Sequence, residues 1–410
     1  MNKQQEPRLR FKGFTGGWEE KRLSDVVEIV GGGTPDTNNS AYWGGEIDWY
    51  SPTEIGENVY ANGSIRKITL LGLQKSSAVI LPADRTVLFT SRASIGDMAI
   101  LTKQGATNQG FQSFIVREGL NIYFLYTMGF KIKEYALKNA SGSTFLEISK
   151  TQLLQMESLF PSLPEQTHLG LFFRRLDSQI AESRAVLEKS RQLKKAMLSK
   201  MFPANGEKIP KIRFKGFEGE WERKKLGEIA FKVKEKNIAY QYAETFTNSA
   251  EFGIISQQDF FDKSISNSEN IGGYYVVQPN DFVYNPRISS FAPVGPIKRN
   301  KLGRTGVMSP LYYVFRLNDE IKPSYLEQYF EGNQWHHFMY LNGDTGARSD
   351  RFSIKNDVFA EMPISFPADK NEQTAIGNFF RQLDETIALQ SAEVEKLNQL
   401  KKGLLAAMLV

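Results

Sequence analysis

Two stretches of the chain carry apolar side chains at the spacing of one helix face. Residues 165–202 and 372–409 are rich in good helix formers and contain no proline. Their apolar positions are Phe173, Leu176, Ile180, Leu187, Met197 and Met201 in the first stretch and Phe380, Leu383, Ile387, Val394, Leu404 and Met408 in the second. At 1.5 Å per residue, each stretch would form a helix roughly 57 Å long. Because a helix with such a stripe has to bury it, we expect the two helices to pack against each other.

Each of these stretches begins with a helix start signal. Ser162 and Glu165 have the spacing of a capping box, and Asp369 and Glu372 repeat that spacing. Prolines close to both points mark chain that is not yet helical. The pattern therefore predicts two long helices that begin close to residues 162 and 369.

The segments 23–160 and 226–365 show a different pattern, with short alternating or apolar runs between turn signals. The predicted strands are residues 77–81, 86–89, 111–116, 274–277, 281–284 and 311–315. Asn62-Gly63, Asn342-Gly343 and the glycines at 31–33 are typical of turns. We expect each segment to form a mixed α/β domain on a small, twisted, largely antiparallel sheet.

The chain repeats itself around these two segments. Residues 7–19 return as residues 210–222, with an Arg-Phe-Lys-Gly-Phe run and a Trp-Glu pair in both copies. The two helical stretches are identical at 20 of 38 positions, beginning with Glu-Gln-Thr in each. The segments between do not match in sequence. A duplicated frame around divergent inserts indicates one task performed on two targets, and it argues against the alternative of two unrelated surface helices.

Composition limits the class of protein. A chain of 410 residues can form two or three domains, and the absence of cysteine excludes disulfides and thiolate metal sites. Its first residues lack the apolar core of a secretion signal, and its longest apolar stretches are too short to span a bilayer. We therefore expect a soluble, cytoplasmic protein. The net charge of +5 and pI of about 9.0 permit a nucleic-acid partner without establishing one.

A strand that ends in a polar loop provides the strongest candidate for binding. The loop in the first segment carries Thr90, Ser91, Arg92 and Ser94, and a looser counterpart in the second carries Arg287, Ser289 and Ser290. An arginine fork can bind guanine O6 and N7 or a phosphate, and hydroxyl groups can fix the DNA backbone. The alternative is that each arginine pairs with an internal carboxylate and holds its own loop.

Other donors of the two segments are candidates for the same surfaces. They are Arg66, Lys67, Lys103, Asn108 and Gln109 in the first segment and Lys298, Arg299, Lys301, Arg304, Arg348 and Arg351 in the second. Asn and Gln can read adenine with two hydrogen bonds. For any one of the basic residues a solvated surface position is the alternative. Aromatic residues such as Trp43 and Trp49 are expected in the core rather than as base-stacking platforms.

Signatures of catalysis are missing from the sequence. The Gly-Gly-Gly-Thr-Pro run at 31–35 lacks the lysine of a phosphate-binding loop. Asn285-Pro286 is followed by Arg287 and Ile288, so it lacks the second proline and the aromatic ring of an adenine methyltransferase motif. The three histidines do not form a metal-ligand set. We expect no catalytic site, metal site or cofactor in this chain.

Together these motifs resemble those of the DNA-specificity (S) subunit of type I restriction–modification systems. The resemblance covers essentially the whole chain. It rests on residues 10–19 and 213–222, 31–35, 90–96, the helix openings at 165–167 and 372–374, and the Leu-Lys-Lys runs at 193–195 and 400–402. Each motif is modest alone, but their duplicated order and spacing are specific.

The resemblance implies an α/β (α+β) protein with two pseudo-symmetric target-recognition domains. Each domain would read one half of a split double-stranded DNA target, and the two long helices would form an antiparallel coiled coil that joins them. The expected boundaries are 1–160 for the first domain, 161–205 for the first long helix, 206–367 for the second domain and 368–410 for the second long helix. The second segment departs from the 31–35 and 90–96 motifs, which implies a different half-site.

The resemblance also implies partners. Two modification subunits would dock on the coiled coil, bind S-adenosylmethionine and methylate adenine, while restriction (motor) subunits would use ATP and Mg²⁺. This chain would be non-catalytic and would not contact a membrane. The main alternative from another class is a bivalent protein-binding scaffold without base readout.

Overall fold

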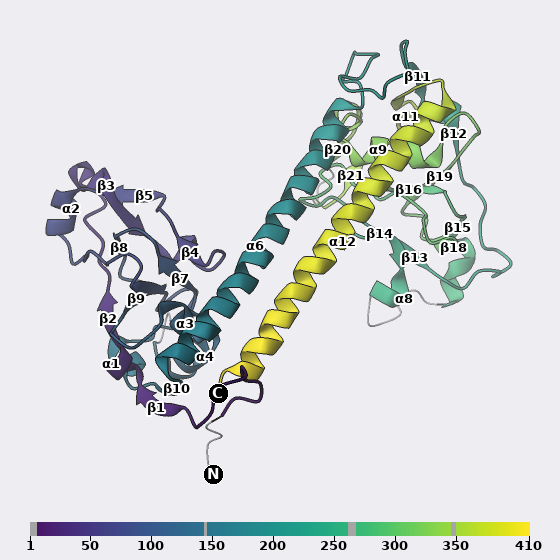
Figure 1. The fold of residues 1–410 in the computed structure, drawn as a ribbon. Helices are drawn as coiled ribbons and strands as arrows, with labels where there is room; N and C mark the ends of the chain where they lie inside the picture. Colours follow the sequence, from purple (N-terminus) through teal and green to yellow (C-terminus); the bar gives the residue numbers. More distant parts are fainter. Residues whose placement is uncertain (1–5, 143–145, 261–267, 346–349) are drawn as a thin grey trace. The chain divides into compact units, whose positions relative to one another are not determined.

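The structure is a computed structural model that describes residues 6–142, 146–260, 268–345 and 350–410 (Figure 1). The chain forms two compact units. The first comprises Met1–Ala185 and Ser391–Val410, and the second comprises Val186–Gln390. Each unit therefore combines one domain with part of each long helix. The expected domain boundaries treat each helix as a separate segment and stay a prediction.

The first unit is built on two sheets and a strand pair. Its five-stranded sheet has the order β2-β9-β6-β7-β4. These strands are β2 Val27–Gly31, β9 Gln112–Val116, β6 Thr86–Phe89, β7 Met98–Leu101 and β4 Tyr60–Ala61. The three-stranded sheet comprises β5 Arg66–Ile68, β3 Trp43–Tyr50 and β8 Gly105–Thr107, and the pair comprises β1 Glu19–Arg22 and β10 Glu157–Phe160. Neighbouring strands are antiparallel except for the β3–β8 and β4–β7 pairs.

Short helices surround these sheets. They are α1 Leu23–Val26, η1 Ser40–Tyr42, η2 Pro52–Glu54, α2 Leu70–Gln74, α3 Ile122–Thr127, α4 Gly129–Asn139 and α5 Lys150–Leu154. Polar residues begin four of them, because Asn39, Thr69, Asn121 and Ser149 accept bonds from backbone N–H groups of the first turn. Phe89, Phe114 and Phe124 are fully buried in the main core of this unit.

The second unit has a four-stranded antiparallel sheet in the order β12-β19-β16-β17. These strands are β12 Ala230–Lys232, β19 Tyr313–Leu317, β16 Phe282–Tyr284 and β17 Ile297–Arg299. The antiparallel pairs are β11 Glu222–Lys225 with β22 Pro363–Phe366, β13 Phe246–Ser249 with β14 Gly253–Ser256, β15 Tyr275–Val277 with β18 Gly306–Met308, and β20 Asp344–Thr345 with β21 Phe352–Ser353. The helices are α7 Leu226–Ile229, α8 Gln257–Phe260, η3 Ser268–Gly273, α9 Pro323–Glu331, α10 His336–Asn342 and α11 Asn356–Ala360.

The two domains share one strand topology although their sequences do not match. In chain order, β2, β6, β7 and β9 lie in the spatial order first-fourth-second-third, and β12, β16, β17 and β19 do the same. The pairs β1–β10 and β11–β22 close the two domains in the same way. The expected mixed α/β fold with two sheet-rich domains is therefore confirmed, and the duplication extends into the divergent inserts.

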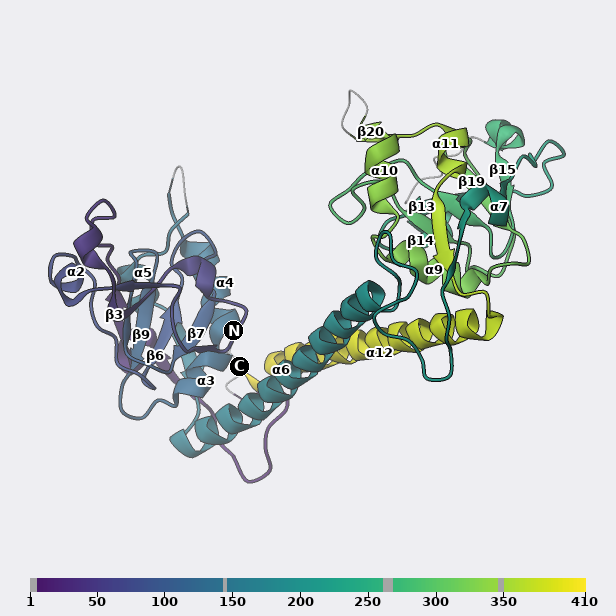
Figure 2. The same cartoon turned by 90° about the horizontal axis from the view of Figure 1, so that it is seen from above.

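The two long helices are α6 Leu163–Lys200 and α12 Lys370–Met408. They begin where the sequence predicted, with Gln166 N donating to Ser162 O at 2.9 Å and Asn371 N donating to Asp369 Oδ1 at 2.8 Å. Parts of the two helices pack antiparallel within each unit (Figures 1 and 2). In the first unit the contacts are Asp177–Lys401 and Arg184–Asn398, and in the second unit they include Lys194–Asp384.

The apolar stripes are largely buried, and the domain cores cover part of them, since Phe173, Leu176 and Ile180 cluster with Phe124 and Phe380 clusters with Tyr325. Phe173, Leu176, Ile180, Leu187, Met201, Phe380 and Met408 are buried, whereas Met197, Leu383, Ile387, Val394 and Leu404 are half-buried. In the described part of the chain, none of the helices combines the length and hydropathy that a bilayer span requires.

The glutamates of the expected capping boxes have another role. Glu165 accepts two bonds from Arg10, with both N–O distances at 2.8 Å, and Glu372 accepts two from Arg213 at 2.7 Å. Glu165 and Glu372 are buried. The capping-box spacing thus located the helix starts but assigned the wrong partner to these carboxylates, because a distant arginine outcompetes the local N–H group.

The next residue of each repeat attaches the domain to the helix. Gln166 Oε1 accepts from Asn121 N at 2.9 Å, and Gln373 Oε1 accepts from Lys322 N at 2.7 Å. Both acceptors are buried, and both donors precede the first residue of a domain helix, α3 or α9. The repeated Glu-Gln pair therefore joins the helix start to the opening segment, residues 7–19 or 210–222, and to the domain.

The opening segments also meet the last turn of a long helix. In the first unit Leu9 N donates to Ala407 O at 2.9 Å, and in the second unit Ile212 N donates to Lys200 O at 2.9 Å. Carbonyl groups at a helix end lack intrahelical partners, so these bonds satisfy them. In each unit, one repeat of the frame thus connects the start of one long helix with the end of the other.

One predicted strand is wrong. Residues 77–81 form no regular strand, and only Leu81 makes an isolated bridge, with Gly105. Ala78 and Leu81 are buried while Val79 is exposed, so the apolar run reaches the core only in part. A Cβ atom on Gly33 would lie 2.4 Å from Ala78 N, so this segment packs against a glycine loop rather than beside a strand.

Candidate DNA-binding surfaces

The arginine loop of the first domain is a closely bonded turn after β6. Thr90 Oγ1 donates to Ser94 O at 2.5 Å and accepts from Asp97 N at 2.9 Å. The turn uses positive φ angles at Ala93 (63°) and Gly96 (92°). Thr90 and Ser91 are fully buried, whereas Arg92 and Ser94 are half-buried. The Thr90 hydroxyl therefore holds the loop, and Arg92 and Ser94 are the residues that a ligand can reach.

Two further loops lie beside Arg92. Ser91 N donates to Gly110 O at 2.8 Å, and a Cβ atom on Gly110 would lie 3.4 Å from Arg92 Nε. The loop at 31–36 joins them, because Thr34 Oγ1 is hydrogen-bonded to Gln109 Oε1. Asn108 Oδ1 accepts from Gly110 N at 2.8 Å and so shapes its own turn. The structure thus brings together Arg92, Asn108 and Gln109 from the predicted set.

Two tryptophans hold the glycine loop in this position. Trp49 Nε1 donates to Gly33 O at 2.8 Å, and Trp43 Nε1 donates to Asp36 O at 3.1 Å. The Arg66 guanidinium lies 3.7 Å from the centre of the Trp43 ring, a cation–π contact. The sequence placed the tryptophans in the core, and Trp49 is buried. Their indole N–H bonds to the loop had no signal in the sequence.

The other predicted cations of this domain lie on or beside the three-stranded sheet. Arg66 and Lys67 are on β5, which β3 separates from β8, and Lys67 pairs with Asp48 at 3.5 Å. Lys103 precedes β8 and Asn108 follows it, so these two residues lie at opposite ends of that strand. Arg66 thus contacts a tryptophan that holds the glycine loop, whereas Asp48 engages Lys67.

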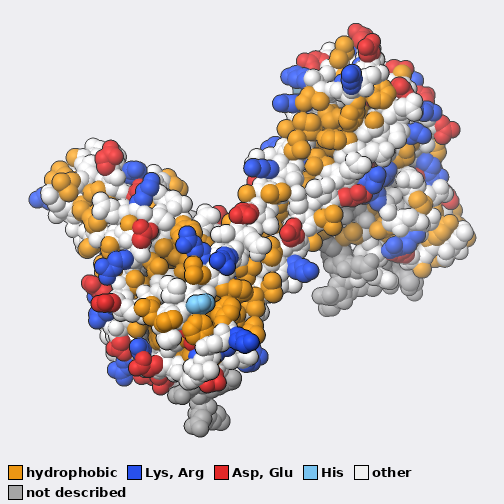
Figure 3. All heavy atoms as spheres, viewed as in Figure 1, with side chains coloured by type: hydrophobic (Ala, Val, Ile, Leu, Met, Phe, Trp, Pro, Cys, Tyr) orange, Lys and Arg blue, Asp and Glu red, His pale blue; other side chains and the backbone are white. Residues whose placement is uncertain are grey.

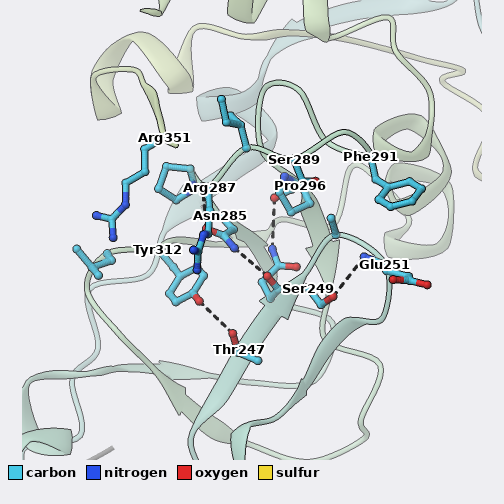
Figure 4. Close-up of a pocket in the computed structure, with 15 residues that line it drawn as sticks. Thr247, Ser249, Glu251, Asn285, Arg287, Ser289, Phe291, Pro296, Tyr312 and Arg351 are labelled. Carbon is cyan, nitrogen blue, oxygen red and sulfur yellow. Dashed lines mark hydrogen bonds between the residues drawn. The ribbon is translucent and has the colours of Figure 1, made fainter. Parts of the chain in front are cut away.

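The corresponding loop of the second domain borders a pocket of about 410 Å³ (Figure 4). Its lining includes Asn285, Arg287 and Ser289 from the loop after β16, Tyr312 from the turn before β19, and Arg351. Polar contacts fix the lining. Asn285 Nδ2 donates to Asn248 O at 2.8 Å, Asn248 Nδ2 donates to Val283 O at 2.7 Å, and the hydroxyl oxygens of Thr247 and Tyr312 are 3.1 Å apart.

Four predicted cations of the second domain have carboxylate partners. Lys298 pairs with Glu331 at 2.6 Å, Arg299 with Glu327 at 2.9 Å, Lys301 with Glu327 at 2.7 Å and Arg304 with Glu244 at 2.7 Å. The hydrogen bond from Arg304 holds the pKa of Glu244 below its ordinary value. Carboxylates of the same domain therefore engage these four residues, for which the sequence had offered a solvated surface position as the alternative to DNA binding.

Arg287, Ser289, Ser290 and Arg351 are exposed. Ser289 Oγ accepts from Ala292 N at 3.2 Å, so this hydroxyl shapes its loop. Within the described ranges, neither Arg287 nor Arg351 has a carboxylate at ion-pair distance. Arg348 lies outside the described residues. On the face drawn in Figure 3, basic and acidic side chains are interspersed, in keeping with the modest net charge.

The arginine loops of the two domains occupy equivalent positions. Arg92 forms an antiparallel bridge with Glu147, and Arg287 forms one with Arg351. The next residues repeat the match, since Ile148 N donates to Ser91 O at 3.0 Å and Phe352 N donates to Pro286 O at 2.7 Å. The looser counterpart predicted from sequence therefore has the same backbone setting. Glu147 was missed, because its distance along the chain from Arg92 gave no signal.

The described residues contain no cluster of three or more His, Cys, Asp or Glu side chains that could hold a metal ion. Arginine, amide and hydroxyl groups dominate both loop regions instead. Such an arrangement can donate hydrogen bonds to bases or phosphates.

Comparisons with known proteins give a consistent result. Residues 15–189 and 218–399 match the family described as the type I restriction modification DNA specificity domain. Over 247 residues, 57% of this chain and 56% of the relative, the chain is 34% identical to the type I restriction enzyme MjaIX specificity subunit of Methanocaldococcus jannaschii. It is 29% identical to the Escherichia coli EcoR124I/EcoR124II specificity subunit over 42% of this chain and 43% of that protein. The chain thus spans at most 56% of the length of the first curated relatives that it matches.

A solved structure shares the fold over the whole length. The type I restriction-modification S subunit from M. genitalium covers 99% of both chains with a TM-score of 0.57 at 13% identity. A structure described as underlying complex assembly and conformational transition of the type I R-M system covers 95% of this chain and 97% of that chain, with a TM-score of 0.55 at 17% identity. At these identities the likeness concerns the fold.

Proposed function

Because this chain belongs to the type I restriction modification DNA specificity domain family, we propose that it is the non-catalytic specificity subunit of such a system. It reads a split target in double-stranded DNA, one half with each domain. It also docks modification subunits and restriction subunits, which supply the chemistry of methylation and cleavage.

The equivalent arginine loops carry this proposal. The two domains share a four-strand topology, and Arg92 and Arg287 occupy equivalent positions in it. Each arginine forms an antiparallel bridge, Arg92 with Glu147 and Arg287 with Arg351. The remaining surroundings differ, with a tryptophan-held glycine loop in one domain and a pocket of about 410 Å³ in the other. One scaffold with two different sets of donors suits two different half-sites.

The long helices supply the spacing and the docking surface. They contain 38 and 39 residues, which correspond to about 57 Å and, at 3.4 Å per base pair, to an upper bound of roughly 17 base pairs. Leu193 and Leu400 are equivalent in the repeat and are 47% and 51% exposed. Two like apolar positions suit two copies of one partner. In the proposal those partners are modification subunits that bind S-adenosylmethionine and methylate adenine.

No step of the chemistry is assigned to this chain. S-adenosylmethionine belongs to the modification subunits, and ATP and Mg²⁺ belong to the restriction (motor) subunits. The contribution of this chain is the choice of site, through the donors of the two loop regions, and the distance between the two readers.

Genome-wide mapping of adenine methylation tests the proposal. Cells would carry the full chain with a cognate modification subunit, the chain alone, or the modification subunit alone. We expect a new split motif in the first case only. An assembled complex that produces no new motif would refute the proposed function.

A bivalent protein-binding scaffold is the second candidate. It is favoured by the carboxylate partners of Lys298, Arg299, Lys301 and Arg304, which leave less free positive charge for DNA. Titration of a duplex at increasing salt separates the two. Phosphate contacts make affinity fall steeply with salt, whereas a scaffold without DNA contacts shows no duplex binding to lose.

A further inference from the structure

The residue opposite the equivalent arginine differs between the two domains, and this difference points to base reading. The bridges Arg92–Glu147 and Arg287–Arg351 pair equivalent backbone positions. Partners in an antiparallel bridge project their side chains to the same side, with Cβ atoms about 4.5–5.5 Å apart. Each domain thus presents a two-residue unit, Arg with Glu in the first domain and Arg with Arg in the second.

The second domain places two like charges opposite each other. Like charges directly opposite each other destabilise a strand pair. Arg287 and Arg351 are both exposed, and the described parts of the chain place no carboxylate within ion-pair distance of either. Glu251, the acidic residue of the pocket lining, donates its backbone N–H to Ser249 Oγ at 3.3 Å, and Figure 4 shows its carboxylate on the Phe291 side, away from both arginines.

The neighbouring cations make this contrast informative. Lys298, Arg299, Lys301 and Arg304 of the same domain all have carboxylate partners. A solvated surface cation needs no ligand, but two adjacent ones at the rim of a concave pocket are placed to share an electron-rich group. Figure 4 shows both guanidinium groups on the Tyr312 side of the pocket.

The exchange of Arg for Glu separates bases from phosphates. Phosphates are the same in every sequence, so a phosphate-contacting position is expected to be basic in both domains. Glu147 would repel a phosphate, whereas a carboxylate can accept a hydrogen bond from cytosine N4. An arginine at the equivalent position donates two bonds to guanine O6 and N7. The residue type at this position, Glu147 or Arg351, therefore matches a difference in the base that each domain reads.

We infer that Arg287 and Arg351 together read guanine in the half-site of the second domain, and that Glu147 occupies the equivalent specificity-determining position in the first. This inference rests on the proposed function, because it assigns the bases that the proposed DNA reader recognises. The two guanidinium groups are the donors, and the O6 and N7 edge of guanine is the acceptor. The half-site of the second domain must therefore contain at least one guanine.

The test is methylation mapping with the full chain and its modification subunit, comparing Arg351→Ala, Arg287→Ala and the matched control Lys301→Ala. Lys301→Ala removes one positive charge from the same domain at a residue that Glu327 engages. We expect both arginine variants to lose preference for guanine in the same half-site by about tenfold or more, with the other half-site and the Lys301→Ala motif unchanged. Arg351→Lys keeps the charge but not the fork, so it should lose the preference as well.

Other results would overturn the inference. A uniform loss across all sequences, or full retention of the motif by Arg351→Lys, would make Arg351 a phosphate contact. A motif without guanine in either half would also overturn it. In all these cases the wild-type chain still directs a split motif, whereas a wild-type complex that directs none would refute the proposed function itself.

Discussion

The repeated frame and the loops that it carries have diverged to different degrees. In the frame, the same two bonds join Arg10 to Glu165 and Arg213 to Glu372, at 2.8 and 2.7 Å. In the loops, equivalent backbone positions present Glu147 in one domain and Arg351 in the other. Contacts that hold a domain on its helices are thus kept in both copies, while side chains that face outward are exchanged. The frame serves geometry, and the loops serve recognition.

The frame itself is not fully symmetric. Asp177 is buried and accepts from the Tyr123 hydroxyl at 2.8 Å and from Lys401 at 2.5 Å. Its repeat partner Asp384 pairs with Lys194 at 2.6 Å and keeps 40% of its side chain exposed. Burial, together with Asp177, raises the pKa of the Tyr123 phenol, so the hydroxyl stays a donor. The hydrogen bond from Tyr123 to Asp177 therefore attaches the first domain to its long helix, whereas the equivalent Asp384 is partly exposed.

The largest expected effect comes from changing the length of the frame. Insertion of one helical turn between Ile180 and Leu193, with a matching turn in α12, lengthens both helices by about 6 Å, or nearly two base pairs. We expect the methylated motif to keep both half-sites and to gain spacer length. An unchanged spacer in methylation mapping would show that the helices do not set the distance.

Breaking a repeated ion pair should cost the most stability. Arg213→Ala leaves the Glu372 carboxylate buried without its partner, which we expect to lower the free energy of unfolding by about 3–5 kcal/mol. Arg10→Ala should have a similar effect through Glu165. Denaturant unfolding of each variant measures both values. Adding Glu372→Gln to Arg213→Ala is the control, because it removes the unpaired charge and should restore part of the loss. Clearly unequal losses in the two units would contradict the equivalence of the two pairs.

Arg92→Ala should change one half-site without changing the frame. Loss of one bidentate arginine contact is expected to relax discrimination by about 1–3 kcal/mol at one position of the first domain's half-site. The other half-site and the spacer should stay as they are. Arg117→Ala is the matched control, since Arg117 is exposed and follows β9 beside the start of β6, at the opposite end of that strand from the arginine loop. A loss that is equal for all sequences would identify Arg92 as a phosphate contact.

The sequence predicted the frame much better than the loops, for a physical reason. The helix starts at Ser162 and Asp369 and the α/β character of the domains follow from local patterns that recur in both copies. Arg10 and Glu165 are 155 residues apart. Both belong to motifs that occur twice in the sequence, but the contact between the two motifs was not inferred from the sequence. Glu147 and the Trp49–Gly33 bond depend on how loops meet in space, and no periodicity encodes that. The burial of Thr90 and Ser91 could not be predicted either, because polar loop residues are usually exposed.

A smaller effect is expected from the tryptophan that supports the glycine loop. Trp49→Phe removes the donor to Gly33 O and should cost about 1 kcal/mol of stability, because one buried hydrogen bond is lost. It should also weaken recognition of the first half-site, since that loop reaches Gln109 through Thr34. Trp335→Phe is the matched control in the second domain, where the indole donates to Gly332 O at 3.0 Å. Thermal unfolding measures the loss of stability, and methylation mapping shows which half-site changes. If both variants affected the same half-site, the proposed role of the Trp49 bond in recognition would be contradicted.

The smallest expected effect is a pH dependence confined to the second domain. Burial lowers the pKa of His336 from its ordinary value of 6.5. The unfolded chain therefore takes up a proton as the pH falls through about 6.5 while folded His336 stays neutral, so stability is fully present above that pH and decreases on acidification. His336 lies in α10, whereas α4 of the first domain contains no histidine. Unfolding at about pH 7.5 and about pH 5.5 should show a smaller difference for His336→Gln than for the wild type. An identical difference would mean that other groups govern this range, and His337→Gln, which alters the neighbouring exposed histidine, controls for the loss of an imidazole.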